Sequence, residues 1–399
     1  MADTASARVP AAAWGVFALG LISALHVGKL PVAIPLLRDE LGISLVQAGF
    51  LLSLLQLAGV VSGVAVGGLA DAKGPHGVMR WGLLCLGLGS AWGALAQSGS
   101  ALMWARALES LGFLWAVLPA PAAMRWHVRE SAALHKSLGL WGAYMPAGSA
   151  LALLLGGLVM PWLGWRAFWW LGAISAWAGA VLLWWLSRDI PVPVSHTGQG
   201  LWQRLTDTWR APGPWALALG FLVYSGQWLA VVGFVPALYA QLGWSVTAAA
   251  LLAAVVAGAN MLGNVLAGRW LARGVARHWV LSWGYGAMAL GGCLAFMDGV
   301  PLPWRLAGVL LFSALGGLVP GALFASAVHL APGPDRVSTT VGWMQQLSSA
   351  GQLLGPPLVA WWATQVGGWH LSWVFTLGCS VLGLCVAQWV RRLSRAASH

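Results

Sequence analysis

The sequence predicts an all-α membrane protein with twelve transmembrane helices arranged as two pseudo-symmetric six-helix halves. Three observations lead to this prediction. The 399 residues are 59% hydrophobic and only 8% charged, whereas about a quarter of a soluble globular chain is charged. Apolar runs of about 20 residues, long enough to cross a bilayer as a helix, recur along almost the whole chain. The two halves also repeat the same marker residues in the same order.

Each span is predicted from one continuous apolar run. The spans of the first half cover residues 12–37, 45–70, 78–97, 101–124, 137–160 and 166–187, and those of the second half cover residues 214–239, 246–270, 278–297, 304–330, 338–363 and 369–390. The leader MADTASARVP carries a single arginine, and the first span is far longer than the core of a signal peptide. We therefore expect no cleavage and no soluble domain with a core of its own.

The basic residues follow the topology of the chain. There are 21 Lys and Arg, and the net charge of +11 would by itself suit a nucleic-acid-binding protein. With the N-terminus inside, however, the outer loops hold Arg38, Arg166 and Arg305, and two further bases, Lys29 and Arg106, fall within spans. The other bases lie on the cytoplasmic side, as the positive-inside rule requires. The pattern predicts a multi-pass protein of the bacterial cytoplasmic (inner) membrane with both termini in the cytoplasm, and no nucleic-acid partner.

Residues 188–213 form a long polar stretch that divides the chain into two sets of six spans. We predict an N-terminal half at 1–187, a cytoplasmic linker at 188–213 and a C-terminal half at 214–399. The matched residues of the two halves are Trp14 with Trp215, Pro35 with Pro236, Leu41-Gly42 with Leu242-Gly243, Gly63 with Gly263, Gly68 with Gly268, Lys73 with Arg273, Gly74 with Gly274, Pro119 with Pro320, and Gly164-Trp165 with Gly368-Trp369. Duplicated halves are how many secondary transporters build a midplane site that opens alternately to each side.

Three short motifs resemble the major facilitator superfamily. The loop GGLADAKG after the second span keeps Gly67, Asp71 and Gly74 of the family pattern, although Lys73 stands one position later than the usual base. RALESLG in the fourth span resembles the family's fourth-helix pattern. GLWGAYMPAG in the fifth span resembles in part the Gly-Pro pattern of antiporters, with Pro146 as its proline. The resemblance covers the whole chain.

The resemblance implies the major facilitator fold, in which the first, fourth, seventh and tenth spans line a central cavity. It also implies a gate on the cytoplasmic side formed by Gly67, Asp71, Lys73 and Gly74, with Pro146 as a further gating residue. The motifs GKLP, RALESLGFL and GLWGAYMPAG look like the cyanate and nitroimidazole permease branch of the family. That likeness implies a small polar or anionic solute.

Three charged residues fall deep within spans that line this cavity. At 1.5 Å per residue, Lys29 lies about 14 Å, Glu109 about 12 Å and Arg106 about 8 Å below the outer end, so Lys29 and Glu109 share a level. Arg106 and Glu109 are three residues apart and face the same way. A charge at the bilayer centre costs at least about 2.5 kcal/mol, which makes this group a candidate functional site. Two other interpretations stay open: Arg106 snorkels to the outer surface, or the group is a structural ion cluster.

We predict that Lys29 and Arg106 bind the substrate and that Glu109 couples transport to protons, with Arg106 controlling its proton affinity. Burial disfavours the ionised carboxylate while the two bases favour it, so a modest rearrangement decides which effect wins. The further candidates for substrate binding are His26, Gln227, Tyr144, Tyr224 and Gln346. His26 is explained equally well as a packing residue. Asn260 and Asn264, one turn apart, are better explained as residues that join helices by hydrogen bonds.

These features predict a secondary active transporter that moves a small anionic or polar solute by alternating access, coupled to protons. The first alternative is a multidrug efflux antiporter. A metal-ion permease is a further alternative, although Met and His show no i,i+4 pairs within spans. The sequence contains no G-x-S-x-G, H-E-x-x-H or G-x-x-x-x-G-K-[ST] motif, so we predict neither an enzyme nor an ATPase. We expect no cofactor, and as partners a small-molecule substrate, protons and the lipid bilayer, with the protein acting as a monomer.

Overall fold

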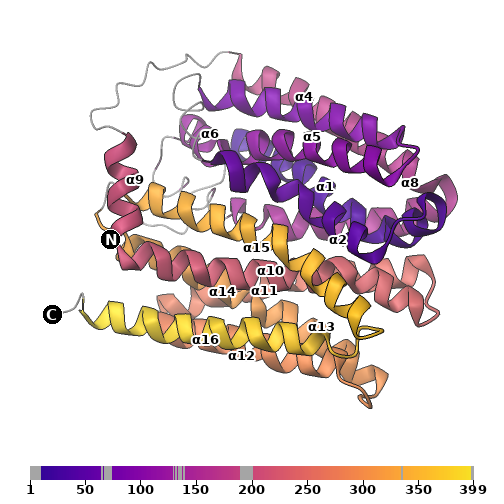
Figure 1. Ribbon diagram of the computed structural model, residues 1–399. Helices are drawn as coiled ribbons and strands as arrows, with labels where there is room; N and C mark the ends of the chain where they lie inside the picture. Colours follow the sequence, from indigo (N-terminus) through magenta and orange to yellow (C-terminus); the bar gives the residue numbers. More distant parts are fainter. Residues whose placement is uncertain are drawn as a thin grey trace.

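The computed structural model is a bundle of long helices that run roughly along one axis (Figure 1). It describes residues 10–63, 66, 74–128, 130, 133, 137, 140–188, 201–333 and 336–396, and within these residues every regular element is a helix. Helices of the first half form the upper layer in Figure 1, and those of the second half form the lower layer. The two ends of the described chain and helix α9 (Leu201–Arg210) lie at one end of the bundle, which we call the linker end.

The N-terminal half begins with one long helix and contains two interruptions caused by proline and glycine. Its elements are α1 (Ala11–Leu41), α2 (Leu45–Ser53), the 3-10 helix η1 (Leu54–Gln56), α4 (Pro75–Ala94), α5 (Gly99–Val117), α6 (Ala120–His127) and α8 (Tyr144–Ser187). After η1 the helix continues to residue 63. The predicted fourth span is divided into α5 and α6 at Pro119, because proline lacks the N–H that would continue the ladder.

Serine side chains start several of these helices. The Oγ atoms of Ser44, Ser98 and Ser245 accept hydrogen bonds from the backbone N–H groups of Gln47, Ala101 and Ala248, at the N-termini of α2, α5 and, in the C-terminal half, α11 (Val246–Ala272). Each serine satisfies a donor that the first turn of a helix leaves without a partner. These caps explain why the helices begin directly after short loops.

The predicted fifth and sixth spans are joined in one element. Helix α8 has 44 residues, but Gly164 within it has φ 74° and ψ 168°, which are not helical. Gly148 and Gly172 both pack against the same part of α1, around residues 21–26, so the chain folds back between them. The structure therefore differs from the predicted loop at 161–165. A single glycine makes the turn, because glycine adopts positive φ without a steric penalty.

The C-terminal half repeats this arrangement. Its elements are α10 (Pro212–Gln241), α11 (Val246–Ala272), α12 (Arg277–Phe296), α13 (Leu302–Gly316), α14 (Leu318–Leu330), α15 (Val337–Gln365) and α16 (Ser372–Ala396). The break between α13 and α14 at Gly317 precedes Pro320, the counterpart of Pro119. The predicted linker 188–213 contains helix α9. Asp207 of α9 accepts a hydrogen bond at 2.8 Å from Arg336, which directly precedes α15.

Nine segments of the described residues are long and apolar enough to cross a membrane. One of these segments is α8, which supplies two crossings because it folds back at Gly164. Helices α4 and α15, with 20 and 29 residues, run along the bundle beside the others (Figure 1). Together they make the twelve crossings of the predicted all-α membrane fold, which is confirmed.

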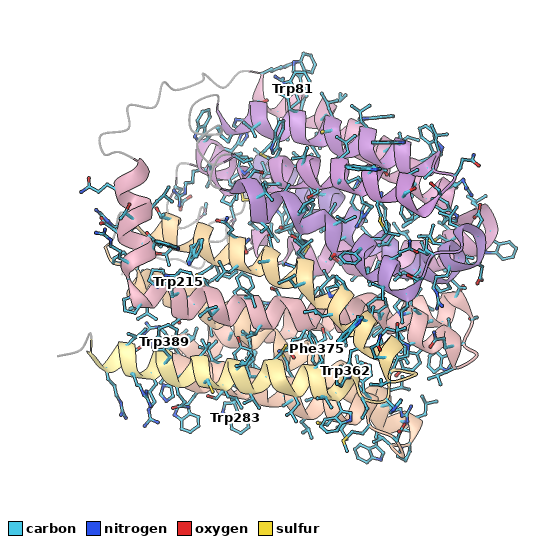
Figure 2. All side chains as sticks on the ribbon, viewed as in Figure 1. Trp81, Trp215, Trp283, Trp362, Phe375 and Trp389 are labelled. Atoms are coloured by element: carbon cyan, nitrogen blue, oxygen red, sulfur yellow. The ribbon has the colours of Figure 1, made fainter. Side chains whose placement is uncertain are left out.

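Large aromatic side chains cover the outside of the bundle. Figure 2 shows Trp81 at its upper edge and Trp283 at its lower edge, and these residues are 64% and 61% exposed. Tryptophan is favoured where a membrane protein meets lipid, because its ring is largely apolar and its N–H is polar. The exposed apolar surface is therefore the lipid-facing surface of the protein.

The two halves touch mainly where α2 and η1 meet α15, where α8 meets α11, and where α1 meets α10. Two of the close approaches between the halves lie toward the end of the bundle opposite the linker end. A Cβ on Gly49 would lie 2.9 Å from the Cα of Pro357. Thr247 donates its hydroxyl to the Gly157 carbonyl at 2.8 Å. The halves are therefore in direct backbone contact at that end.

Candidate functional site

Four ionisable side chains meet inside the N-terminal half: His26 and Lys29 of α1, and Arg106 and Glu109 of α5. We call this group the acid–base cluster. All four residues are at most 1% exposed. A spacing of three residues places both members of each pair on one face of their helix, and these two faces meet. The structure thus brings Lys29 and Glu109 together, as their shared depth indicates, and places Arg106 beside Glu109, as the three-residue spacing indicates.

Glu109 is the centre of the acid–base cluster. Its Oε1 accepts a hydrogen bond from Lys29 Nζ at 2.5 Å, and its Oε2 accepts one from Arg106 Nη1 at 2.5 Å. The Nδ1 atom of His26 lies 3.4 Å from Oε1. One carboxylate is therefore shared by two cations. Because the surroundings are apolar and buried, each attraction is stronger than it would be at the protein surface.

The ammonium group of Lys29 has a partner for each of its three protons. It donates to Glu109 and, at 2.8 Å, to the hydroxyl of Ser90 on α4, and it lies 3.2 Å from His26 Nδ1. An ammonium group only donates, so the last contact requires His26 to accept at Nδ1 and to carry its proton at Nε2. The indole of Trp169 on α8 covers the ammonium, with its ring centroid 4.6 Å away.

Arg106 is held by backbone carbonyls as well as by Glu109. Its Nη1 donates to the His26 carbonyl at 2.8 Å, and its Nε donates to the Leu51 carbonyl at 3.2 Å. These contacts and its complete burial contradict the interpretation that Arg106 snorkels to the outer surface. Two atoms, Arg106 Nη2 and His26 Nε2, are buried without a hydrogen-bond partner in the part of the chain that the structure describes. They are donors that a water molecule or a ligand could satisfy.

Small residues let neighbouring helices approach the acid–base cluster closely. A Cβ on Gly89 of α4 would lie 2.7 Å from the backbone nitrogen of Glu109. A Cβ on Gly172 of α8 would lie 3.3 Å from Cε1 of His26. A larger side chain at either position would push the helices apart and lengthen the contacts of the cluster. The glycines of these spans therefore support its geometry.

The acid–base cluster is enclosed by its own half of the chain. The partners of Lys29 and Arg106 lie on α1, α2, α4, α5 and α8. The structure differs here from the expectation of a cavity occupied by water and substrate. The physical reason is that the charges satisfy one another, so the cluster tolerates removal of its water better than an isolated charge would.

The C-terminal half holds a neutral hydrogen-bond network instead of charges. The amide of Asn260 on α11 donates to the Tyr224 hydroxyl at 2.9 Å and to the Ser313 carbonyl at 2.9 Å. Trp228 of α10 donates to the Ser313 hydroxyl at 3.1 Å. Asn264 donates to the Asn260 carbonyl at 3.2 Å, so both asparagines make the hydrogen bonds expected of residues that join or brace helices. Sequence analysis missed Trp228 and Ser313, because one Trp or Ser in an apolar span forms no pattern.

Gln227 and Tyr144, two of the predicted substrate-binding residues, are buried. Gln227 of α10 accepts a hydrogen bond from Ser380 of α16 at 3.3 Å. Its Nε2 has no partner among the described residues. Tyr144 begins α8, and its ring stacks on Trp141 with centroids 4.3 Å apart. Both side chains are thus engaged within their own halves.

Neutral amides lie at the contact between the halves. Gln346 of α15 donates to the Val60 carbonyl at 2.8 Å. Gln56 of η1 donates to the side chain of Gln352 on α15 at 3.1 Å. The predicted lining residue Gln346 therefore joins the two halves directly. Gln56 escaped the sequence analysis because an isolated Gln is equally typical of helix packing.

Of the predicted gating residues, Gly67, Asp71 and Lys73 lie outside the described residues. Gly74 directly precedes α4 with φ 83°, a backbone conformation that favours glycine. Pro146 lies in the first turn of α8, where its missing N–H would have no helical partner in any case. Pro146 therefore fits its helix without a kink.

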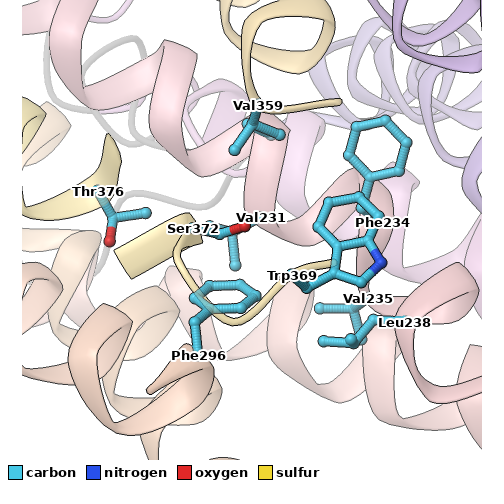
Figure 3. Close-up of a pocket in the computed structure, with 10 residues that line it drawn as sticks. Val231, Phe234, Val235, Leu238, Phe296, Val359, Trp369, Ser372 and Thr376 are labelled. Carbon is cyan, nitrogen blue, oxygen red and sulfur yellow. The ribbon is translucent and has the colours of Figure 1, made fainter. Parts of the chain in front are cut away.

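A small pocket lies in the C-terminal half, between α10, α12, α15 and α16 (Figure 3). Its free space is near the minimum that holds one water molecule. Phe234 and Trp369 form its aromatic wall, with ring centroids 5.0 Å apart. The buried hydroxyl of Ser372 on its lining has no hydrogen-bond partner within the described ranges. The predicted site residues do not line this pocket.

Comparison with known protein sequences identifies one family and several relatives. The sequence model of the Major Facilitator Superfamily matches residues 16–238 and residues 216–399. A chloramphenicol resistance protein of Pseudomonas aeruginosa is 27% identical over 80% of this chain and 76% of that protein. A puromycin resistance protein of Streptomyces alboniger is 31% identical over 38% of this chain, and the chain spans only 31% of that protein's length. A probable 4-methylmuconolactone transporter of Cupriavidus pinatubonensis is 26% identical over 40% of this chain and 38% of that protein.

Solved structures of transporters have the same fold. A bacterial homologue of the human lysosomal transporter Spinster, in an inward-facing and unoccupied conformation, superposes with a TM-score of 0.74 at 17% identity, covering 98% of this chain and 99% of the other. For a D-xylose-proton symporter the TM-score is 0.74 at 16% identity, covering 95% and 96%. For a nucleoside transporter it is 0.78 at 13% identity, covering 95% and 99%. At these identities the likeness concerns the fold alone.

Proposed function

Since this chain belongs to the Major Facilitator Superfamily and is a multi-pass membrane transporter rather than an enzyme, we propose that it is a proton-coupled secondary transporter of a small anionic or polar solute. The observation that carries this proposal is the acid–base cluster, in which Lys29 and Arg106 share the carboxylate of Glu109 inside the membrane. When well-packed apolar residues of similar volume replace buried ion pairs, a protein is often equally stable or more stable. The charges are therefore better explained by transport than by stability.

In the proposed mechanism Glu109 carries the proton. As a carboxylate it pairs with both bases, sharing its one negative charge between them, and holds α1 against α5. Once protonated, Glu109 becomes a hydroxyl donor at one oxygen and loses most of its attraction for Lys29 and Arg106. The two bases are then buried cations without a counter-charge, which need water or an anion. Proton uptake therefore favours an open cluster, and proton release favours the sealed cluster described above.

The proposed solute is polar or anionic. With Glu109 protonated, Lys29 and Arg106 would offer two positive charges, and the unpartnered Arg106 Nη2 and His26 Nε2 would offer donors to an acceptor oxygen. The remaining predicted substrate-binding residues of this proposal are Gln227, Tyr144, Tyr224 and Gln346. The resemblance to cyanate and nitroimidazole permeases supports the same class of solute, as does the name of the 4-methylmuconolactone transporter.

The proposal includes an orientation and a division of the chain. The linker end faces the cytoplasm of a bacterial cell, and residues 1–187 and 214–399 move as two bodies of a monomer, joined by residues 188–213. Gating involves Gly67, Asp71, Lys73 and Gly74, which precede α4 in the sequence, and Pro146 of α8. The distribution of basic residues supports this orientation. On a Cys-free background, a cysteine introduced at position 199 should resist impermeant labelling of intact cells, and its labelling from outside would reverse the orientation.

Transport by purified protein in liposomes tests the role of Glu109. Candidate solutes are first selected by thermal shift from cyanate, nitroimidazoles, chloramphenicol, puromycin and 4-methylmuconolactone. Glu109→Gln keeps the shape of the side chain and removes its charge. It should abolish accumulation driven by a pH gradient yet preserve exchange between two solute-loaded compartments. The matched control is Glu40→Gln, an acid of α1 outside the acid–base cluster, which should accumulate solute normally. Wild-type accumulation by Glu109→Gln would assign the proton to another group.

Drug efflux is the second candidate function. It is favoured by the chloramphenicol resistance protein, which matches 80% of this chain. Efflux would use the same proton site with the solute moving in the opposite direction. Cells that produce the protein should then tolerate more chloramphenicol or puromycin, and Glu109→Gln should remove that tolerance. Unchanged tolerance, together with uptake of a small anion, would support the first candidate.

A further inference from the structure

Two histidines outside the acid–base cluster meet at the linker end of the N-terminal half. His76 is the second residue of α4, and His127 is the last residue of α6. Helix α4 leaves the linker end and α6 returns to it, so the two residues lie at the same level of the bundle. His76 is 8% exposed and His127 is partly exposed. The pair therefore lies at the margin of the protein interior, within reach of ions from solution.

The two imidazole rings direct their Nε2 atoms at each other. These nitrogens are 3.0 Å apart, the ring centroids are 5.0 Å apart, and the ring planes are inclined at 88°. A tetrahedral Zn²⁺ with two imidazole ligands at about 2.0–2.1 Å would hold the nitrogens about 3.3 Å and the ring centroids about 5.2 Å apart. The pair is within a few tenths of an ångström of this geometry. The ring of Trp126 packs edge-on against His76, with centroids 5.4 Å apart, and helps to hold its orientation.

We propose that His76 and His127 form a binding site for a divalent transition-metal ion of the Zn²⁺ class. Neutral imidazole nitrogen is a ligand that these ions favour. In the ion-free pair, one Nε2–H donates to the other Nε2. Binding replaces this hydrogen bond with two nitrogen–metal bonds, and the donating ring keeps its proton at Nδ1 instead. Water fills the remaining positions of the tetrahedron. The ion is a bound ligand at the linker end, separate from the transported solute.

A metal ion at this place links two consecutive spans. It joins the start of α4, directly after Gly74 with its positive φ, to the end of α6. The ion thus restrains the linker ends of the two helices relative to each other and stabilises the folded N-terminal half. This inference does not depend on the proposed solute or proton site, because metal binding is measured without transport.

Calorimetric titration of the full-length protein, purified in detergent without a histidine tag, tests the site. Zn²⁺ should bind with one ion per chain, and the unfolding temperature should rise at saturation, because a ligand that binds the folded state stabilises it. Mg²⁺, which prefers oxygen ligands, should do neither. His76→Ala and His127→Ala should each weaken Zn²⁺ binding at least tenfold. His127→Cys should retain binding, because a thiolate replaces the imidazole as ligand.

The matched control is His329→Ala, since His329 is an exposed histidine at the linker end of α14. This variant should bind Zn²⁺ as the wild type does. Protection of His76 and His127 from diethylpyrocarbonate by Zn²⁺, read by mass spectrometry on the wild type, requires no variant and should follow the calorimetric affinity. The assignment is wrong if the double variant His76→Ala/His127→Ala binds Zn²⁺ as tightly as the wild type. It is equally wrong if Zn²⁺ leaves both histidines of the wild type unprotected.

Discussion

The two halves of the molecule pack corresponding helices in the same way, but charged residues lie at the centre of the N-terminal half and uncharged residues at the matching positions of the C-terminal half. In the N-terminal half, Gly89 of α4 lies against the α5 backbone at Glu109, where a Cβ would come within 2.7 Å of the Glu109 nitrogen. In the C-terminal half, Gly291 of α12 lies in the same way against α13, with a Cβ 2.7 Å from the Phe312 nitrogen. Phe312 therefore stands where Glu109 stands. An apolar ring occupies the position of the central charge.

The other members of the acid–base cluster also have uncharged counterparts. By the repeat and by this glycine packing, the counterparts are Gln227 for His26, Ala230 for Lys29 and Val309 for Arg106. All three counterparts are buried. The C-terminal half shows that this arrangement of helices is stable at this level without any charge. The comparison teaches that the charges of the N-terminal half are not a requirement of the fold.

The largest expected effect comes from giving the N-terminal half the residues of the C-terminal half. Glu109→Phe alone leaves two buried cations without a counter-charge and should cost about 3–5 kcal/mol of unfolding free energy. The triple variant Lys29→Ala, Arg106→Val, Glu109→Phe removes every charge and should recover most of this loss. Thermal unfolding in detergent, with elution profiles to confirm folding, measures both. A triple variant as unstable as the single one would show that the charges are part of the packing itself.

A smaller effect is expected in the neutral network of the C-terminal half. Asn260→Leu removes the hydrogen-bond partner of Tyr224 and a donor to the Ser313 carbonyl. Interhelical hydrogen bonds in membranes contribute about 0.6 kcal/mol on average and up to about 1.7, so the loss should be about 1–2 kcal/mol. Because no charge is removed, accumulation driven by a pH gradient should persist. A folded Asn260→Leu protein that exchanges solute but no longer responds to the gradient would show that coupling involves both halves.

The charged half was easier to predict from the sequence than the neutral one. A charge in an apolar span is conspicuous, and the helical rise per residue gives its depth in the membrane. The contact of Lys29 with Glu109 therefore followed from their similar depths, and that of Arg106 with Glu109 from their spacing of three residues. The network around Asn260 was predictable only in part. Trp228 and Ser313 are common in membrane helices, and their contact depends on how distant segments pack.

Enclosure of the acid–base cluster could not be predicted at all. It depends on the close approach of α4 at Gly89 and of α8 at Gly172, and a glycine in an apolar span does not reveal which helix it faces. The same limit applies to the turn at Gly164. The sequence marks a glycine between two apolar runs, but only the backbone dihedral angles show that one residue makes the turn.

A second matching pair of contacts lies at the end of the bundle opposite the linker end. In the N-terminal half, the indole nitrogen of Trp165 donates to Glu40 at 2.6 Å, and in the C-terminal half that of Trp369 donates to Gln241 at 3.0 Å. The tryptophans match in the repeat, and so do their acceptors. The N-terminal contact differs by its charge, because Glu40 also forms an ion pair with Arg166.

The smallest expected effect is that of Glu40→Gln, which turns the N-terminal contact into a copy of the C-terminal one. Glutamine keeps an acceptor for Trp165, and the side chains of Arg166 and Glu40 are 35% and 47% exposed, so the lost ion pair should cost less than about 1 kcal/mol. Glu40→Leu should cost more, because the nearly buried indole would then lack an acceptor. Thermal unfolding compares the two variants, and added salt should reduce the difference between wild type and Glu40→Gln. If both substitutions lower the unfolding temperature equally, charge stabilises this end of the N-terminal half, and an acceptor for the indole does not. The two halves would then differ here as well.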